Sequence, residues 1–120
     1  MRRSQRRLLA VSLTVCSALA AGCGSNGYPK LEDADGAALI SLAHRITGEG
    51  ACAQVRDIER LQTRAIALVN AGRVPDELQE PMMSAVGAVT ARRPRCPAGA
   101  ATAAAQKARD LETWLSRYSR

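Results

Sequence analysis

The stretch CAQVRDIERLQTRAIALVNAGRVP, residues 52–75, decides the fold class of this 120-residue chain. Its apolar residues recur at spacings of three and four, the period of a helix with one buried face. They are Val55, Ile58, Leu61, Ala65, Leu68 and Val69. Gly72 and then Val74-Pro75 follow, and these residue types end a helix. The stretch therefore predicts a helix from about Cys52 to Asn70 or Ala71.

Three further segments show the same period. They run from Leu31 or Glu32 to Thr47, from Asp76 to Arg93, and from Ala98 or Gly99 to Tyr118. Their predicted core residues are Ala34, Ala38, Leu39, Leu42 and Ile46, then Leu78, Met82, Val86 and Val89, and finally Ala101, Ala104, Ala108, Leu111, Leu115 and Tyr118. Pro81 either bends the third helix or begins it, and the sequence leaves both alternatives open. Four helices with short connections predict one all-α domain over residues 31–120, a small antiparallel bundle.

The first 23 residues have the organisation of an export signal. Four arginines within residues 2–7 precede an uncharged, mostly apolar run over residues 8–21, and Gly22-Cys23 follows. The sequence LAAGC, residues 19–23, resembles the lipobox of bacterial lipoproteins. That resemblance implies that residues 1–22 are a signal peptide, that Cys23 carries diacylglycerol, and that residues 23–30 are a short tether. It places the domain on the extracytoplasmic face of the cell membrane.

Two alternatives to the lipoprotein signal remain. One is a secreted protein that is cut elsewhere, and the other is an uncut membrane anchor, although the apolar run is shorter than the roughly 20 residues that span a bilayer. Arg6-Arg7-Leu8-Leu9 also resembles part of a twin-arginine signal, so the secretion route stays open, with general secretion favoured.

Charge argues against a nucleic-acid partner. The whole chain has 17 Lys and Arg against 11 Asp and Glu, but removal of the four signal arginines leaves 13 against 11. A domain so nearly balanced lacks the basic excess that nucleic-acid binding needs.

The cysteines provide a check on the predicted bundle. In the lipoprotein interpretation Cys16 is removed and Cys23 carries lipid, so Cys52 and Cys96 remain in an oxidising compartment. Cys52 opens the second helix and Cys96 follows the third, and in an antiparallel hairpin these two ends meet. We therefore predict a Cys52–Cys96 disulfide, which closes a loop of about 45 residues and contributes roughly 4 kcal/mol in the chain-entropy model.

The mature segment also resembles a loosely defined group of uncharacterised secreted helical proteins from actinobacteria. The shared elements are a helix opened by cysteine near Cys52, a turn such as Val74-Pro75-Asp76, and a second cysteine about 45 residues on. This resemblance implies no activity.

Residues with catalytic or metal-binding chemistry are sparse. His44 is the only histidine, and the three or four soft ligands of a zinc site are absent from the sequence. Ser41 lies one helical turn from His44, a spacing common on helix surfaces, and no pair of carboxylates converges across a predicted cleft. We therefore expect neither an enzyme nor a cofactor or metal site.

Two groups of arginines are candidates for binding. Arg56, Arg60 and Arg64 recur every four residues on the second helix, a stripe that could contact an acidic partner or an anionic ligand. Arg73, Arg117 and Arg120 would return to the bilayer at the tether end of the bundle, where they could contact anionic head groups. Ordinary solvated surface arginines and arginines that favour a helix dipole are the structural alternatives.

The sequence therefore predicts a lipid-anchored helical module of the cell envelope that holds a protein partner at the membrane surface. The alternative is a carrier of a small ligand or a lipid, which would need an apolar pocket of several hundred Å³ between the helices.

Overall fold

The computed structural model describes residues 29–120, and within this range the chain forms four helices joined by loops. They are α1 (Asp33–Gly48), α2 (Ala51–Asn70), α3 (Asp76–Ala91) and α4 (Thr102–Tyr118). The predicted all-helical fold is confirmed. The predicted signal peptide, the lipid-bearing Cys23 and residues 24–28 of the tether lie outside the described residues.

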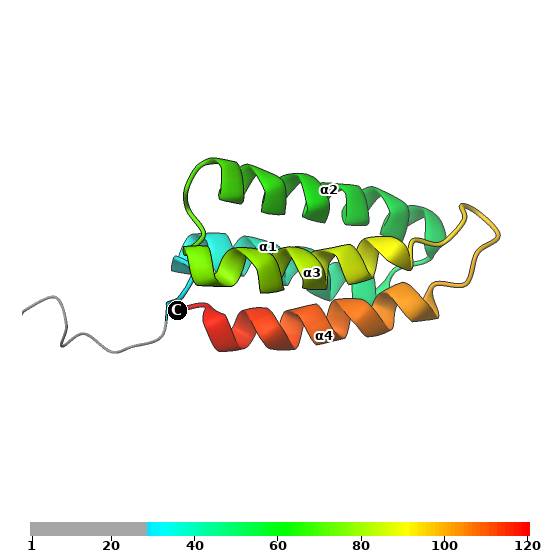
Figure 1. The fold of residues 1–120 in the computed structure, drawn as a ribbon. Coiled ribbons are helices and arrows are strands. Elements are labelled where there is room, and N and C mark those ends of the chain that lie inside the picture. The colour runs from blue at the N-terminus through cyan, green and yellow to red at the C-terminus, as the bar shows by residue number, and fades with distance from the viewer. Residues whose placement is uncertain (1–28) are drawn as a thin grey trace, which may run out of the picture.

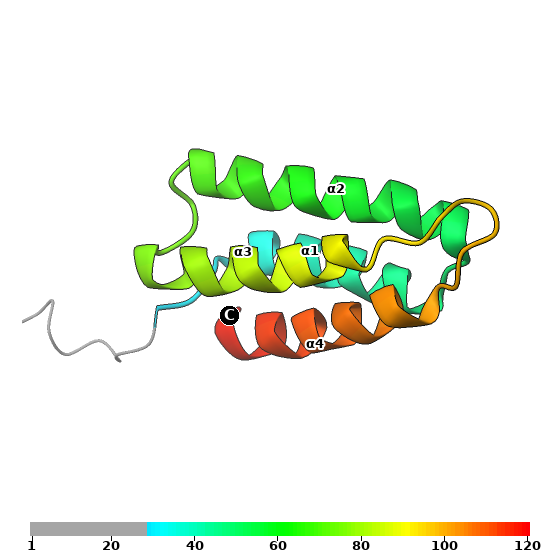
Figure 2. The ribbon, with the colours of Figure 1, turned by 45° about the vertical axis from the view of Figure 1, so that its right-hand side comes forward.

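The helices form an antiparallel bundle in up-down-up-down order (Figure 1). Both α1 and α3 pack against α2 and α4, so every helix lies beside its neighbours in the chain and α4 closes the ring against α1. Figure 2 shows the same arrangement from a second direction. The start of α1, the α2–α3 turn and the end of α4 therefore share one end of the bundle.

A disulfide joins the two ends that the hairpin brings together. Cys52 lies in the first turn of α2 and Cys96 lies in the loop after α3, and their Cα atoms are 4.7 Å apart. The predicted bond between Cys52 and Cys96 is confirmed. It fastens the α2–α3 hairpin at the end opposite its turn, where the chain offers no short connection of its own.

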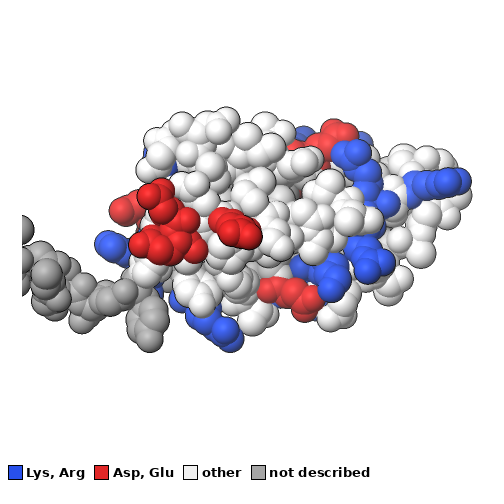
Figure 3. Space-filling view, viewed as in Figure 1, with Lys and Arg blue, Asp and Glu red and all other residues white. Residues whose placement is uncertain are grey.

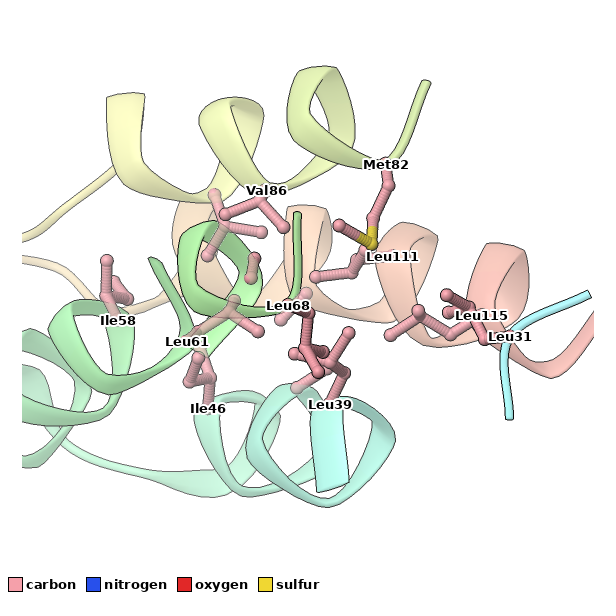
Figure 4. Packing of buried hydrophobic residues seen from close by; sticks show 14 of the residues in the cluster. Leu31, Leu39, Ile46, Ile58, Leu61, Leu68, Met82, Val86, Leu111 and Leu115 are labelled. Carbon is pink, nitrogen blue, oxygen red and sulfur yellow. The ribbon is translucent and has the colours of Figure 1, made fainter. Parts of the chain in front are cut away.

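Aliphatic side chains and alanines fill the centre of the bundle (Figure 4). The buried hydrophobic residues are Leu31, Leu39, Ala43, Ile46, Ile58, Leu61, Ala65, Leu68, Val74, Leu78, Met82, Val86, Val89, Ala104, Ala105, Ala108, Leu111 and Leu115. Trp114 and Tyr118 are partly buried and pack against the edge of this core, with ring centroids 4.8 Å apart. Without phenylalanine, the core depends on close helix approach at its alanines.

The buried face of α1 is turned from the predicted one. Ala34 is exposed and Leu42 only partly buried, whereas Asp35, Gly36 and Ala43 are buried. The helical period defines a stripe of apolar residues, but the positions of α2 and α4 decide which edge of that stripe faces inward. Four predicted core residues outside α1 are likewise only partly buried: Val55 and Val69 of α2, Ala101 just before α4, and Tyr118 of α4.

The α2–α3 turn depends on one residue with a left-handed backbone conformation. Gly72 has a φ of +70°, a conformation that costs glycine little. The N–H groups of Gly72 and Arg73 donate to the carbonyl oxygens of Val69 and Leu68, both at 3.0 Å. This pair of bonds is a Schellman motif and ends α2 at the predicted place.

Helix α3 is one continuous element with Pro81 inside it, which decides between the two alternatives that the sequence left open. It ends at Ala91, two residues earlier than predicted, and α4 begins at Thr102, later than Ala98 or Gly99. The α3–α4 loop is therefore longer than predicted, and it contains Cys96.

The two ends of the described chain are fastened to each other. Leu31 N–H donates to the Tyr118 carbonyl at 2.8 Å, and Arg120 N–H donates to the Leu31 carbonyl at 3.4 Å. Gly36 approaches this junction so closely that a Cβ there would lie 2.5 Å from Ser119 Cβ. Leu31, which follows the predicted tether, thus lies beside the end of α4.

Candidate functional site

An open groove of about 630 Å³ lies on the surface between α1 and α2. Its lining includes all three arginines of the predicted stripe: Arg56, Arg60 and Arg64. The remaining lining residues are Leu42 of α1 and Glu59, Thr63 and Ala67 of α2. The structure therefore brings the predicted partner-binding residues to one surface depression, to which a second helix also contributes.

The groove arises because α2 buries its opposite face. Ile58, Leu61 and Leu68 point into the core, so residues at the intervening positions point outward. Arginines four residues apart then lie one above another on the outward side of the helix. The same periodicity that folds α2 thus positions the stripe.

One buried carboxylate anchors the middle of the stripe. Asp57 is only 4% exposed, and its Oδ1 accepts hydrogen bonds from Arg60 Nη1 and Arg45 Nη2, both at 3.0 Å. Arg45 belongs to the last turn of α1, so the pair also ties α1 to α2. Arg60 is therefore held in place by the fold.

The two outer arginines of the stripe, Arg56 and Arg64, lack an ion-pair partner among the described residues, although the charge of Arg56 acts on Glu49. Glu59, the one acidic residue of the lining, accepts a hydrogen bond from Arg93 Nη2 at 2.8 Å. Because Arg93 neutralises this carboxylate, the groove retains a net positive charge.

A second carboxylate adjoins Asp57. Burial, the hydrogen bond with Asp57 and the negative charge of Asp57 together raise the pKa of Glu49 from 4.5 to about 7. The hydrogen bond from Glu49, followed by Arg45 and Arg60, lowers the pKa of Asp57 despite its burial. Glu49 Oε2 is buried and has no hydrogen-bond partner among the described residues, and protonation of Glu49 removes the repulsion between two neighbouring carboxylates.

Sequence reasoning missed the Glu49–Asp57 pair. A signal was present, since Gln54 and Asp57 occupy the helical register of Leu61 and Leu68 and are polar residues in a core-facing position. Gln54 is fully buried and its Nε2 donates to the carbonyl oxygens of Ile46 and Ala101, at 2.8 and 2.9 Å.

The three arginines predicted to contact the membrane lie at the tether end of the bundle. Arg117 is in the last turn of α4, Arg120 follows α4, and Arg73 follows α2. Arg73 Nε donates to Asp35 Oδ2 at 2.9 Å, and Asp35 is 3% exposed. Arg73 is therefore committed to an ion pair within the fold, and membrane contact at this end stays a prediction.

Acidic residues also lie at the tether end of the bundle, where α1 and α3 begin. Asp33 and Asp35 lie in the first turn of α1, and Asp76 and Glu77 lie in the first turn of α3. On the face drawn in Figure 3, acidic side chains gather where α3 begins and basic ones gather toward the α3–α4 loop. The tether end is therefore of mixed charge, and basic residues collect at the far end of this face.

His44 lies on the surface between two helices. Its Nδ1 is 3.2 Å from Glu112 Oε1 of α4, and its side chain is 73% exposed.

Within residues 29–120, no three His, Cys, Asp or Glu side chains are grouped so that they could hold a metal ion. None of the described helices is both long and apolar enough to cross a bilayer.

Comparisons with known proteins found no relative of this chain. No family model, no curated protein and no solved structure matches this chain.

Proposed function

We propose that this chain is a lipoprotein of the extracytoplasmic face of the cell membrane, anchored through Cys23. Its helical domain binds a protein partner there and catalyses no reaction. The lipobox-like residues 19–23 support the anchor. The observation that carries the binding role is the arginine groove between α1 and α2.

The like charges of the stripe destabilise α2, and interactions within residues 29–120 offset this only in part. Like charges four residues apart on a helix destabilise it by a few tenths of a kcal/mol per pair. Asp57 pairs with Arg60, whereas within residues 29–120 neither Arg56 nor Arg64 forms an ion pair, and the charge of Glu49 acts on Arg56 without one. An acidic surface that docks in the groove would supply the missing charges, and this supports a binding role for the stripe.

The alternative of a small-ligand or lipid carrier has less support. A carrier needs an enclosed, mostly apolar pocket with a few convergent polar groups. The groove is open to solvent, and three of its seven lining residues are arginine. We therefore rank a protein partner above a lipid or a small molecule.

Site-specific photocrosslinking in the membrane fraction tests the binding role. A photoreactive residue at Thr63 is expected to give a protein adduct that disappears in the Arg56→Gln/Arg60→Gln/Arg64→Gln variant. Two controls are matched to the experiment: the probe at exposed Gln106 of α4, and a variant with Gln at three exposed arginines outside the groove, Arg92, Arg95 and Arg109. An adduct at Thr63 that survives the stripe variant would overturn this assignment of the groove.

The anchor has its own test. The intact mass of protein from the membrane fraction is expected to match Cys23–Arg120 plus diacylglycerol, and reduction of the disulfide should add two hydrogen atoms, one to each sulfur. A lipid-free protein in the culture medium would remove the membrane half of the proposal.

A further inference from the structure

We propose that the groove receives one acidic α-helix of the partner, laid along α2 with its carboxylates facing Arg56, Arg60 and Arg64. This inference rests on the proposed function and adds the kind of structural element that is bound. Charge complementarity, the spacing of the arginines and the composition of the groove carry it.

The stripe is elongated, which favours an elongated anion. Residues 56 to 64 extend about 12 Å along the helix axis, with about 6 Å between successive arginines. A single phosphate or carboxylate could contact only part of such a row. Acidic residues placed four apart on a second helix repeat the same spacing, so each could meet one arginine.

The rest of the groove suits a helix surface. Leu42 and Ala67 offer apolar contact beside the arginines, and side chains on a docked helix can pack between them as in ordinary helix pairs. Glu59 does not oppose an acidic ligand, because Arg93 neutralises it. The ion pair between Arg60 and Asp57 holds the Arg60 side chain in place before binding. Less conformational entropy of that side chain is therefore lost when a partner docks.

The described residues offer fewer contacts to an extended peptide than to a helix. Such a peptide satisfies its backbone N–H and C=O groups by pairing with an exposed strand edge. Residues 29–120 contain four helices and one isolated bridge, Leu31–Ser119, which lies at the tether end. A helix brings its backbone hydrogen bonds with it and needs only a groove and matching charges.

Fluorescence anisotropy with two synthetic peptides of identical composition tests the proposal. In the first, an alanine-rich helix carries three Glu residues four apart on one face, with Leu beside them. In the second, the same Glu residues are distributed around the helix. We expect the mature protein, residues 23–120, to bind the first peptide about tenfold more tightly than the second, because three exposed pairs each contribute modestly. The stripe variant should lose that preference, and the Arg92/Arg95/Arg109 variant should keep it.

Equal binding of the two peptides would overturn the helix proposal, as would displacement of the first peptide by water-soluble short-chain phosphatidylglycerol at the same concentration. If neither peptide binds while the Thr63 adduct still depends on the stripe, the helix proposal fails and the proposed function stands. If the adduct is also absent, both fail.

Discussion

Removal of the Cys52–Cys96 disulfide should weaken the fold through the unfolded state. The bond closes a loop between residues 44 apart in sequence, for which the chain-entropy model gives about 4 kcal/mol at room temperature. Cys96 is exposed and Cys52 only partly buried, so a Cys52→Ser/Cys96→Ser variant loses little packing. Nearly all of the effect should therefore come from the greater freedom of the unfolded chain.

Urea titration followed by far-ultraviolet circular dichroism measures the loss. A domain of this size unfolds with a urea slope of about 1–1.5 kcal/mol per M, so the midpoint should fall by roughly 3 M. Total stabilities of about 5–15 kcal/mol leave the variant helical in water unless the parent lies at the low end of that range. Reduced parent protein is the matched control and should show the same loss. A loss below about 1 kcal/mol at an unchanged slope would refute the argument, because the unfolded chain would then gain little freedom.

Two further predictions concern the carboxyl pair and the junction between the ends of the domain. The pKa of Glu49 is raised from 4.5 to about 7, so the stability that its protonated form contributes is complete below about pH 4.5 and is lost as the pH rises toward 7. The urea midpoint should fall between about pH 5 and pH 8, and Glu49→Gln should flatten this slope; an unaltered slope would contradict the pairing with Asp57. Gly36→Ala should destabilise the domain by about 1–3 kcal/mol because its Cβ would overlap the Ser119 side chain. Adding Ser119→Gly should restore most of the loss in a double-mutant cycle, and a purely additive cycle would exclude the overlap as the cause.

The candidate site was partly predictable. The stripe itself follows from residue spacing, since arginines at positions 56, 60 and 64 share one side of any helix that includes them. Its position in a groove does not, because the sequence predicted Leu42 in the core, whereas the rotation of α1 leaves Leu42 partly exposed beside the stripe. The sequence also placed Arg73 among the candidate membrane-contact residues, whereas the structure pairs it with buried Asp35, 38 residues earlier in the chain.

What the sequence determined by itself was local or nearly so. The helical periods predicted four helices, and Gly72 predicted where the second one ends. The disulfide followed because an antiparallel hairpin brings the start of the second helix, at Cys52, next to the end of the third, near Cys96. Only the tertiary structure decided which edge of α1 is buried, that Leu31 joins Tyr118, and that Glu49 and Asp57 interact beside Arg45 and Arg60. These features depend on how the helices are rotated and set against one another. That arrangement comes from the packing of all four apolar faces at once, which no single segment of the chain encodes.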